Sequence, residues 1–319
     1  MRLRGCLTRH RAMPGRKSGI FKRIFTGADG VRAGWRIVLF AAIAGTLIAA
    51  GMFLLHHFRV FQRLGIDHPH HPPPLTPLAV VVGDSVLLLS SLAATGAMAW
   101  LEGAGFTAYG LGGARKTRLF LGGWLGGFAA LGLLAGLLIA TGDNIVSRGA
   151  HGALGDLRYG AEWLGAALLI ALAEEISARG YLLWTLARGT GFWPASILLA
   201  IGFGAIHGTN PGETPIGLLT AATAGLLFCL AIRLTGSLWW AIGFHMAWDW
   251  SENFVYGSRD SGLRFAGRML ELRPHGNIWF SGGVTGPEGS VFCLAVMALA
   301  AIATYILLRP VRIKTFARG

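Results

Sequence analysis

The stretch Ala173-Glu174-Glu175-Ile176-Ser177-Ala178-Arg179-Gly180 places two carboxylates and a guanidinium in the middle of a long apolar run. Ionisable groups at that depth in a membrane are costly, so they usually mark a functional site. Two later apolar runs carry one histidine each, His207 and His245. A glutamate and two histidines gathered in a lipid-walled cavity could activate a water molecule.

The composition around this stretch is that of a membrane protein. Of the 319 residues, 53% are hydrophobic and 13% are charged, with a mean hydropathy of +0.55. A soluble domain carries roughly 25% charged residues, so a large soluble helical protein is disfavoured. We predict an all-α polytopic membrane bundle of about eight transmembrane helices. The expected spans are 37–55, 78–101, 120–141, 163–186, 192–207, 215–234, 237–256 and 290–308.

The distribution of basic residues predicts the orientation of these spans. The net charge is +13, and residues 1–36 hold ten Lys/Arg against one acid, Asp29. With both termini in the cytoplasm, inside segments carry 19 Lys/Arg and outside loops carry 8, in agreement with the positive-inside rule. We expect the cell (plasma) membrane as the location. Anionic lipid, and not nucleic acid, is the expected partner of the basic termini.

The expected spans and the basic termini divide the chain into five parts. These are a basic segment (1–32), three accessory spans (33–157), a catalytic core of four helices (158–256), a loop (257–288), and a last span with a basic tail (289–319). The first span is too long, and its basic leader too extended, for a cleavable signal peptide. The three cysteines are far apart in the sequence and suggest no disulfide framework.

Several features outside the core were interpreted as structural. The Pro/His-rich loop 67–74 could bind a metal ion, but its dense prolines favour a stiff, solvated loop. Asp84 is a lone acid in the second span and is expected to make a hydrogen bond or to line a polar cavity. Glycines at small-xxx-small spacing in span 120–141 predict close packing on a neighbouring helix. In loop 257–288, residues 263–272 could form an amphipathic helix on the membrane surface.

Helical geometry separates the two adjacent glutamates. Glu175 and Arg179 are four residues apart, which predicts that they share a face and pair. Glu174 is rotated away from Arg179 and is left to face a cavity, where it could act as a general base. Gly180 is expected to let another backbone approach. A purely structural ion network of all three charges remains an alternative.

Each histidine has its own context. His207 closes an apolar helix just before an Asn210-Pro211 turn, and by itself such a residue could be a packed core histidine. His245 and Asp249 are four residues apart, so the carboxylate could orient the imidazole.

Taken together, these segments resemble the CPBP family of intramembrane proteases, which includes the type II CAAX prenyl proteases and the bacteriocin-processing and Abi proteins. The Glu-Glu-x-x-x-Arg motif is Glu174-Glu175-Ile176-Ser177-Ala178-Arg179. The Phe-x-x-x-His motif runs from Phe203 to His207, and the third motif runs from His245 to Asp249, with Asp in place of the usual Asn.

The resemblance implies an intramembrane endopeptidase of metalloprotease-like type. Glu174 and His207 would activate water, and His245 and Asp249 would stabilise the oxyanion or orient the substrate carbonyl. Glu175, Arg179 and Phe203 would support the site. Zinc bound by Glu174, His207 and His245 is possible, and a metal-free Glu/His mechanism is equally open. The expected partner is a peptide or protein substrate at the membrane, possibly lipidated.

Two other classes of function stay open from the sequence. A non-catalytic membrane binding or immunity protein could keep the same bundle. A small-solute transporter could use the buried charges as a proton or substrate path, although the sequence shows no paired inverted repeats.

Overall fold

The computed structural model describes residues 25–27, 30–65 and 74–308. Most of the basic segment 1–32, nearly all of the Pro/His-rich loop and the basic tail lie outside these residues. In order along the chain, the elements are β1 Thr26–Gly27, β2 Gly30–Val31, α2 Ala33–His57, α3 Val60–Arg63, α4 Pro77–Leu101, η1 Phe106–Ala108, α5 Lys116–Ala140, β3 Asn144–Arg148, α6 Ala153–Arg179, α7 Tyr181–Thr190, α8 Phe192–His207, α9 Pro215–Thr235, α10 Trp239–Trp250, η2 Ser251–Val255, β4 Leu270–Pro274, α11 Ile278–Ser281, η3 Pro287–Gly289 and α12 Val291–Leu307.

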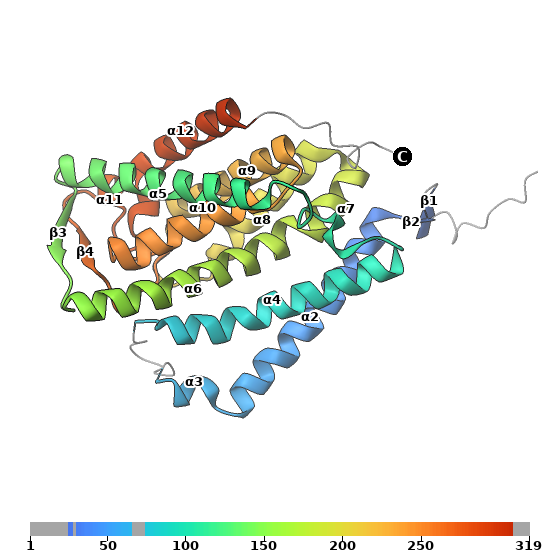
Figure 1. Cartoon of the computed structure of the whole chain (residues 1–319), viewed down its shortest axis with the longest axis horizontal. Coiled ribbons are helices and arrows are strands. Elements are labelled where there is room, and N and C mark those ends of the chain that lie inside the picture. The colour runs from blue at the N-terminus through green and yellow to red at the C-terminus, as the bar shows by residue number, and fades with distance from the viewer. Residues whose placement is uncertain (1–24, 28–29, 66–73, 309–319) are drawn as a thin grey trace, which may run out of the picture.

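The long helices run side by side and form one bundle (Figure 1). Helices α4 and α6 are neighbours, as are α5 and α10, and α8 and α9. The short antiparallel β3–β4 ladder and α11 close one end of the bundle, and α7 lies at the other. The predicted all-α membrane bundle is confirmed.

Within residues 25–27, 30–65 and 74–308, four helices are long and apolar enough to cross a membrane: α2, α4, α5 and α9. Helices α8 and α12 are apolar but shorter. The outer faces of these helices expose large apolar side chains, including Phe53, Leu89, Leu125, Ile201 and Leu307. Such a continuous apolar exterior suits contact with lipid. Every expected span contains a helix, and the count of eight membrane crossings remains a prediction.

Helix starts follow local sequence chemistry. Thr76 and Thr214 accept a hydrogen bond from the backbone three residues ahead, and each is followed by a proline at the first helical position. Side-chain capping and a proline already set for helical φ both favour a helix start. Gly236 ends α9 with φ +69°, a conformation that glycine adopts without strain.

The fourth expected span differs from the structure at Gly180. The run 163–186 is not one helix, because α6 ends at Arg179 and α7 starts at Tyr181. A Cβ at Gly180 would collide with the carbonyl oxygen of Ile176 in its own helix. The glycine therefore permits the break between α6 and α7, and the expectation that it admits another backbone remains a prediction.

The proposed surface helix at 263–272 was also wrong. This segment is irregular up to Met269 and then enters strand β4, which pairs with β3 in antiparallel register. Leu270, Glu271, Leu272 and Arg273 alternate apolar and charged side chains, which is the period of a strand and not of a helix. The pairing ties loop 257–288 to the connection between α5 and α6.

The glycine-rich helix α5 packs closely on α10, as its spacing predicted. A Cβ at Gly123 would collide with the carbonyl oxygen of Trp240, and one at Gly127 with that of Phe244. From the other side, a Cβ at Gly243 would collide with the carbonyl oxygen of Phe120. The two backbones thus touch, as small residues allow in membrane helix pairs.

Candidate active site

A cavity of about 400 Å³ lies inside the bundle between α4, α6, α8, α10 and the long loop after η2. Its apolar walls include Phe203, Phe228 and Trp248. Among the residues that line it are seven with ionisable side chains: Asp84, Glu174, His207, His245, Asp249, Asp260 and Glu288. Convergent ionisable groups in a mostly apolar cavity are typical of an active site.

Glu175 lies behind the cavity, against the protein interior. Its side chain is 0% exposed, and its Oε1 lies 2.5 Å from Nη1 of Arg179, which is 1% exposed. The Arg179 guanidinium stacks on the rings of Phe203 and Phe228, with its Cζ 4.3 Å and 5.2 Å from their centroids. An isolated charge would be very costly at this buried position. The Glu175 carboxylate and the two phenylalanine rings stabilise the guanidinium there.

Glu174, one residue earlier on α6, lines the cavity instead. Its Oε2 is buried and makes no hydrogen bond within the part of the chain that the structure describes. The nearest basic group is His245, whose Nε2 lies 3.8 Å from this oxygen. A carboxylate without a fixed partner keeps its lone pairs for a proton of water or substrate.

His245 on α10 is surrounded by carboxylates. Its Nδ1 is 3.0 Å from Oε1 of Glu175, and its Nε2 is 3.6 Å from Oδ1 of Asp249 as well as 3.8 Å from Glu174. The ring also stacks on Phe228, with centroids 5.5 Å apart. An imidazole that donates from Nδ1 to Glu175 has a fixed ring plane, and its Nε2 points to the cavity carboxylates.

His207 ends α8 and lines the same cavity. Its Nδ1 lies 2.7 Å from the carbonyl oxygen of Phe203. A carbonyl can only accept, so Nδ1 carries the hydrogen and the Nε2 of the neutral ring keeps a lone pair. His207 is therefore held in the tautomer that can take a proton or bind a metal through Nε2.

The residues implied by the resemblance are thus close together, with Phe203 contacting both Arg179 and His207. Three acids that lie near them were not included in the expected site: Asp84, Asp260 and Glu288. Asp84 had been interpreted as more structural than functional. The other two lie in the stretch interpreted as a connecting loop, and their isolation in the sequence gave no signal.

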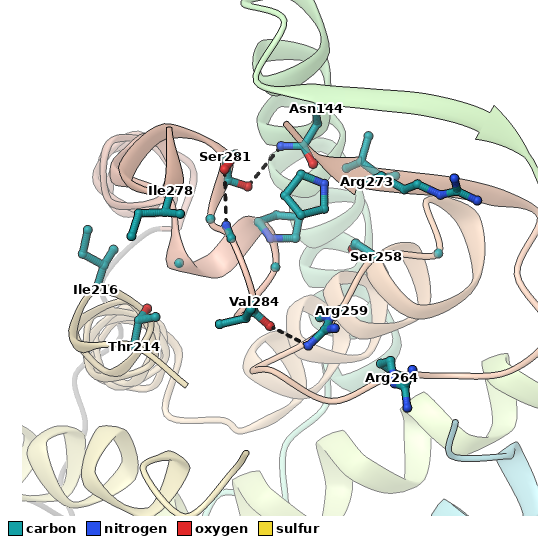
Figure 2. Close-up of a pocket in the computed structure, with 18 of the residues that line it drawn as sticks. Asn144, Thr214, Ile216, Ser258, Arg259, Arg264, Arg273, Ile278, Ser281 and Val284 are labelled. Atoms are coloured by element: carbon teal, nitrogen blue, oxygen red, sulfur yellow. Dashed lines mark hydrogen bonds between the residues drawn. The ribbon is translucent and has the colours of Figure 1, made fainter. Parts of the chain in front are cut away.

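A second cavity of about 930 Å³ lies under the long loop, beside β4. Figure 2 shows Arg259, Arg264 and Arg273 around it, with Arg259 donating to the carbonyl oxygen of Val284 and Asn144 donating to that of Ser281. Its carboxylate, Glu271, is paired with Arg268 and Arg273. It lacks the histidines and free carboxylate that proton transfer needs, so the chemistry is assigned to the smaller cavity.

Donor atoms for a metal are present in the smaller cavity. The Nε2 atoms of His207 and His245 and the Glu174 carboxylate are of the type that zinc accepts. Among the described residues, however, the three carboxylate or imidazole groups that gather within 4.8 Å of one another are Glu252, Asp260 and Glu288. The geometry therefore supplies zinc donors without bringing them into a compact set.

The comparison with protein families finds a match for the middle of the chain. The family described as type II CAAX prenyl endopeptidase, Rce1-like, matches residues 158–251. This segment runs from the first turns of α6 to the start of η2, and it contains Glu174, His207, His245 and Asp249. No curated protein matches the chain. The resemblance to CAAX proteases is confirmed, and with the apolar helices it identifies an integral membrane protein.

Proposed function

We propose that this chain hydrolyses a peptide bond of a membrane-associated or lipidated substrate through a water activated by Glu174 and His207, because residues 158–251 match the Rce1-like type II CAAX prenyl endopeptidase family. The observation that carries the proposal is the free carboxylate of Glu174, which shares one cavity with His207 and faces His245.

The proposed mechanism assigns one step to each side chain. Glu174 accepts a proton from water while Nε2 of His207 holds that water by hydrogen bonding. The hydroxide attacks the carbonyl carbon of the scissile bond. His245, protonated on both nitrogens between its carboxylates, donates from Nε2 to the developing oxyanion. Glu174 then returns its proton to the leaving amine, and the C–N bond breaks.

Glu175 and Arg179 support this arrangement from behind. The Glu175 carboxylate accepts from both Arg179 and His245, so a single group fixes the arginine and the imidazole plane. Asp249 lies on the Nε2 side of His245, with its Oδ1 3.6 Å from that nitrogen, and would help to orient the imidazole. If zinc were bound, Glu174, His207 and His245 would be its ligands, and it would lower the pKa of the attacking water.

The test uses the full chain purified in detergent. A fluorogenic prenylated peptide should be cleaved, and Glu174→Ala should abolish cleavage. Glu162→Ala is a matched control, because Glu162 is on the same helix but pairs with Arg158 at the surface. A parallel arm with a zinc chelator distinguishes the two ways of activating water. A non-catalytic binding protein predicts no cleavage of any such peptide and a function that survives Glu174→Ala.

A further inference from the structure

Three acidic side chains converge at the edge of the active-site cavity without belonging to the catalytic set. Glu252 comes from η2, Asp260 from the following loop and Glu288 from η3, and one carboxylate oxygen of each lies within 4.8 Å of the others. Asp260 and Glu288 also line the cavity. Three successive segments of the chain therefore bring three acidic groups together beside the cavity.

Several polar groups at this point are buried and lack hydrogen-bond partners among the described residues. Glu252 is 0% exposed, and neither of its carboxylate oxygens makes a hydrogen bond in the described part of the chain. Next to it, Asn253 is 1% exposed, and its amide, which is close to Asp260, makes no hydrogen bond of normal geometry with described residues. Buried polar groups almost always have partners, so these atoms point to a ligand.

Glu288 is held in place by neutral donors. The Trp248 indole nitrogen donates to one of its oxygens at 3.0 Å, and the Ser261 hydroxyl donates to the other at 2.7 Å. Each carboxylate oxygen can accept more than one bond. Glu288 is thus oriented by two hydrogen bonds and still has lone pairs for a cation.

The backbone that carries Glu252 and Asn253 is unusual. Residues 251–255 form a turn of π-helix, closed by the Tyr256 amide donating to the carbonyl oxygen of Ser251. The Ser258 amide in turn donates to the carbonyl oxygen of Glu252. Single π-turns are rare and are often found at functional sites. This one carries Glu252 and Asn253, both buried, at the point where the three acids meet.

The charge at this point is not compensated by basic residues. Within the described residues, no arginine or lysine forms an ion pair with Glu252, Asp260 or Glu288. Burial and the nearby Glu288 raise the pKa of Asp260 to about 8, while the adjacent Asn253 amide and His245 oppose the rise. Three carboxylates this close must either hold protons or hold a cation.

We propose that Glu252, Asp260 and Glu288 bind a hard divalent cation, of the Ca²⁺, Mg²⁺ or Mn²⁺ class. All three side chains offer oxygen ligands, which these cations prefer, and no histidine or cysteine is among them. The ion would join η2 to the loop and to η3, and so would hold the loop over the catalytic cavity. This site is separate from the proposed water-activating residues.

The test follows binding of Tb³⁺ to the full chain in detergent. Since the Trp248 indole contacts Glu288, bound Tb³⁺ should show tryptophan-sensitised emission that saturates and is displaced by Ca²⁺ or Mn²⁺. Glu252→Gln and Asp260→Asn should each weaken binding about tenfold or more, since affinity follows the number of charged ligands. Glu271→Gln, a loop carboxylate already paired with two arginines, is the control and should bind normally.

Melting temperature gives a second readout that does not depend on activity. In wild type, Ca²⁺ or Mn²⁺ should raise the melting temperature. Glu252→Gln removes repulsion between carboxylates, so without cation it should melt at or above the wild-type temperature, yet show no rise on adding cation. Trp248→Phe should lose most sensitised emission while it keeps the cation-dependent rise.

Two results would overturn the proposal. Saturable binding that both ligand variants leave unchanged would place the cation elsewhere. The absence of sensitised emission together with no cation-dependent change in melting temperature would mean that the cluster holds protons alone. Neither result bears on the proposed peptidase, because neither removes a water-activating residue.

Discussion

Replacing Glu175 and Glu174 one at a time by glutamine should produce opposite defects, although the two residues are adjacent. Glu175 is fully buried and its carboxylate is shared by Arg179 at 2.5 Å and His245 at 3.0 Å. Glu175→Gln leaves the buried guanidinium without its counter-charge, a change that typically costs about 3–5 kcal/mol. At roughly 2–4 °C per kcal/mol for a chain of this class, the melting temperature should fall by roughly 6–20 °C.

Glu174→Gln should instead lower the cleavage rate and leave the stability unchanged. Its buried oxygen has no hydrogen-bond partner among the described residues, so the amide keeps the shape and removes no fixed contact. The melting temperature should stay close to the wild-type value. Loss of a general base should lower the rate by about 10²–10⁴-fold, and a hundredfold loss corresponds to about 2.7 kcal/mol in the activation barrier.

The assay measures peptide cleavage and thermal unfolding for both variants in one detergent, with Glu162→Gln as the α6 control. Unstable but partly active Glu175→Gln, together with stable and inactive Glu174→Gln, is the expected pair of results. A stable, inactive Glu175→Gln beside an unstable Glu174→Gln would refute the reasoning and make Glu175 the base.

Three further outcomes are expected. His207→Leu should abolish cleavage with little change in folding, because the imidazole Nε2 faces the cavity; near-normal turnover would make His207 a packing residue. Gly127→Ala should lower the melting temperature and the rate, since its Cβ would enter the backbone of α10 and overpacking costs about 1–3 kcal/mol, whereas Gly136→Ala on the same helix meets open space and should be neutral. Reporter fusions at Gly319 and within 257–288 should lie on opposite sides of the membrane, with Gly319 inside; an external Gly319 would contradict the eight-span topology.

The helices and the local pairs followed from sequence because both depend on short-range spacing. Apolar runs gave the bundle, and a separation of four residues placed Arg179 beside Glu175 and Asp249 beside His245. The break at Gly180 could not be read in this way, since a continuous apolar run hides a change in a single ψ angle. Only the backbone coordinates show that a Cβ at position 180 would collide with the carbonyl oxygen of Ile176.

Residue spacing could not predict which acids from distant segments line the same cavity. Asp84 is 90 residues before Glu174, and Asp260 and Glu288 lie in what reads as a polar connection. Asp84 reaches the cavity from α4, whereas Asp260 and Glu288 reach it from the long loop, which is paired to the rest of the fold through β3 and β4. The alternation in 270–273 was the available signal for that ladder, and it is too short to outweigh a helical reading of the longer segment.

The contact between α5 and α10 has a consequence for transferring residues 158–251 to another protein. The carbonyl group that Gly127 accommodates belongs to Phe244, the residue directly before His245. Helix α5 lies outside residues 158–251, so part of the packing that positions the helix of His245 comes from a helix that the matched segment does not include. A chimera that joins residues 158–251 to the accessory helices of another protein should keep every side chain of the candidate site. These side chains should still be misaligned, unless the chimera also includes the α5 glycines that contact α10.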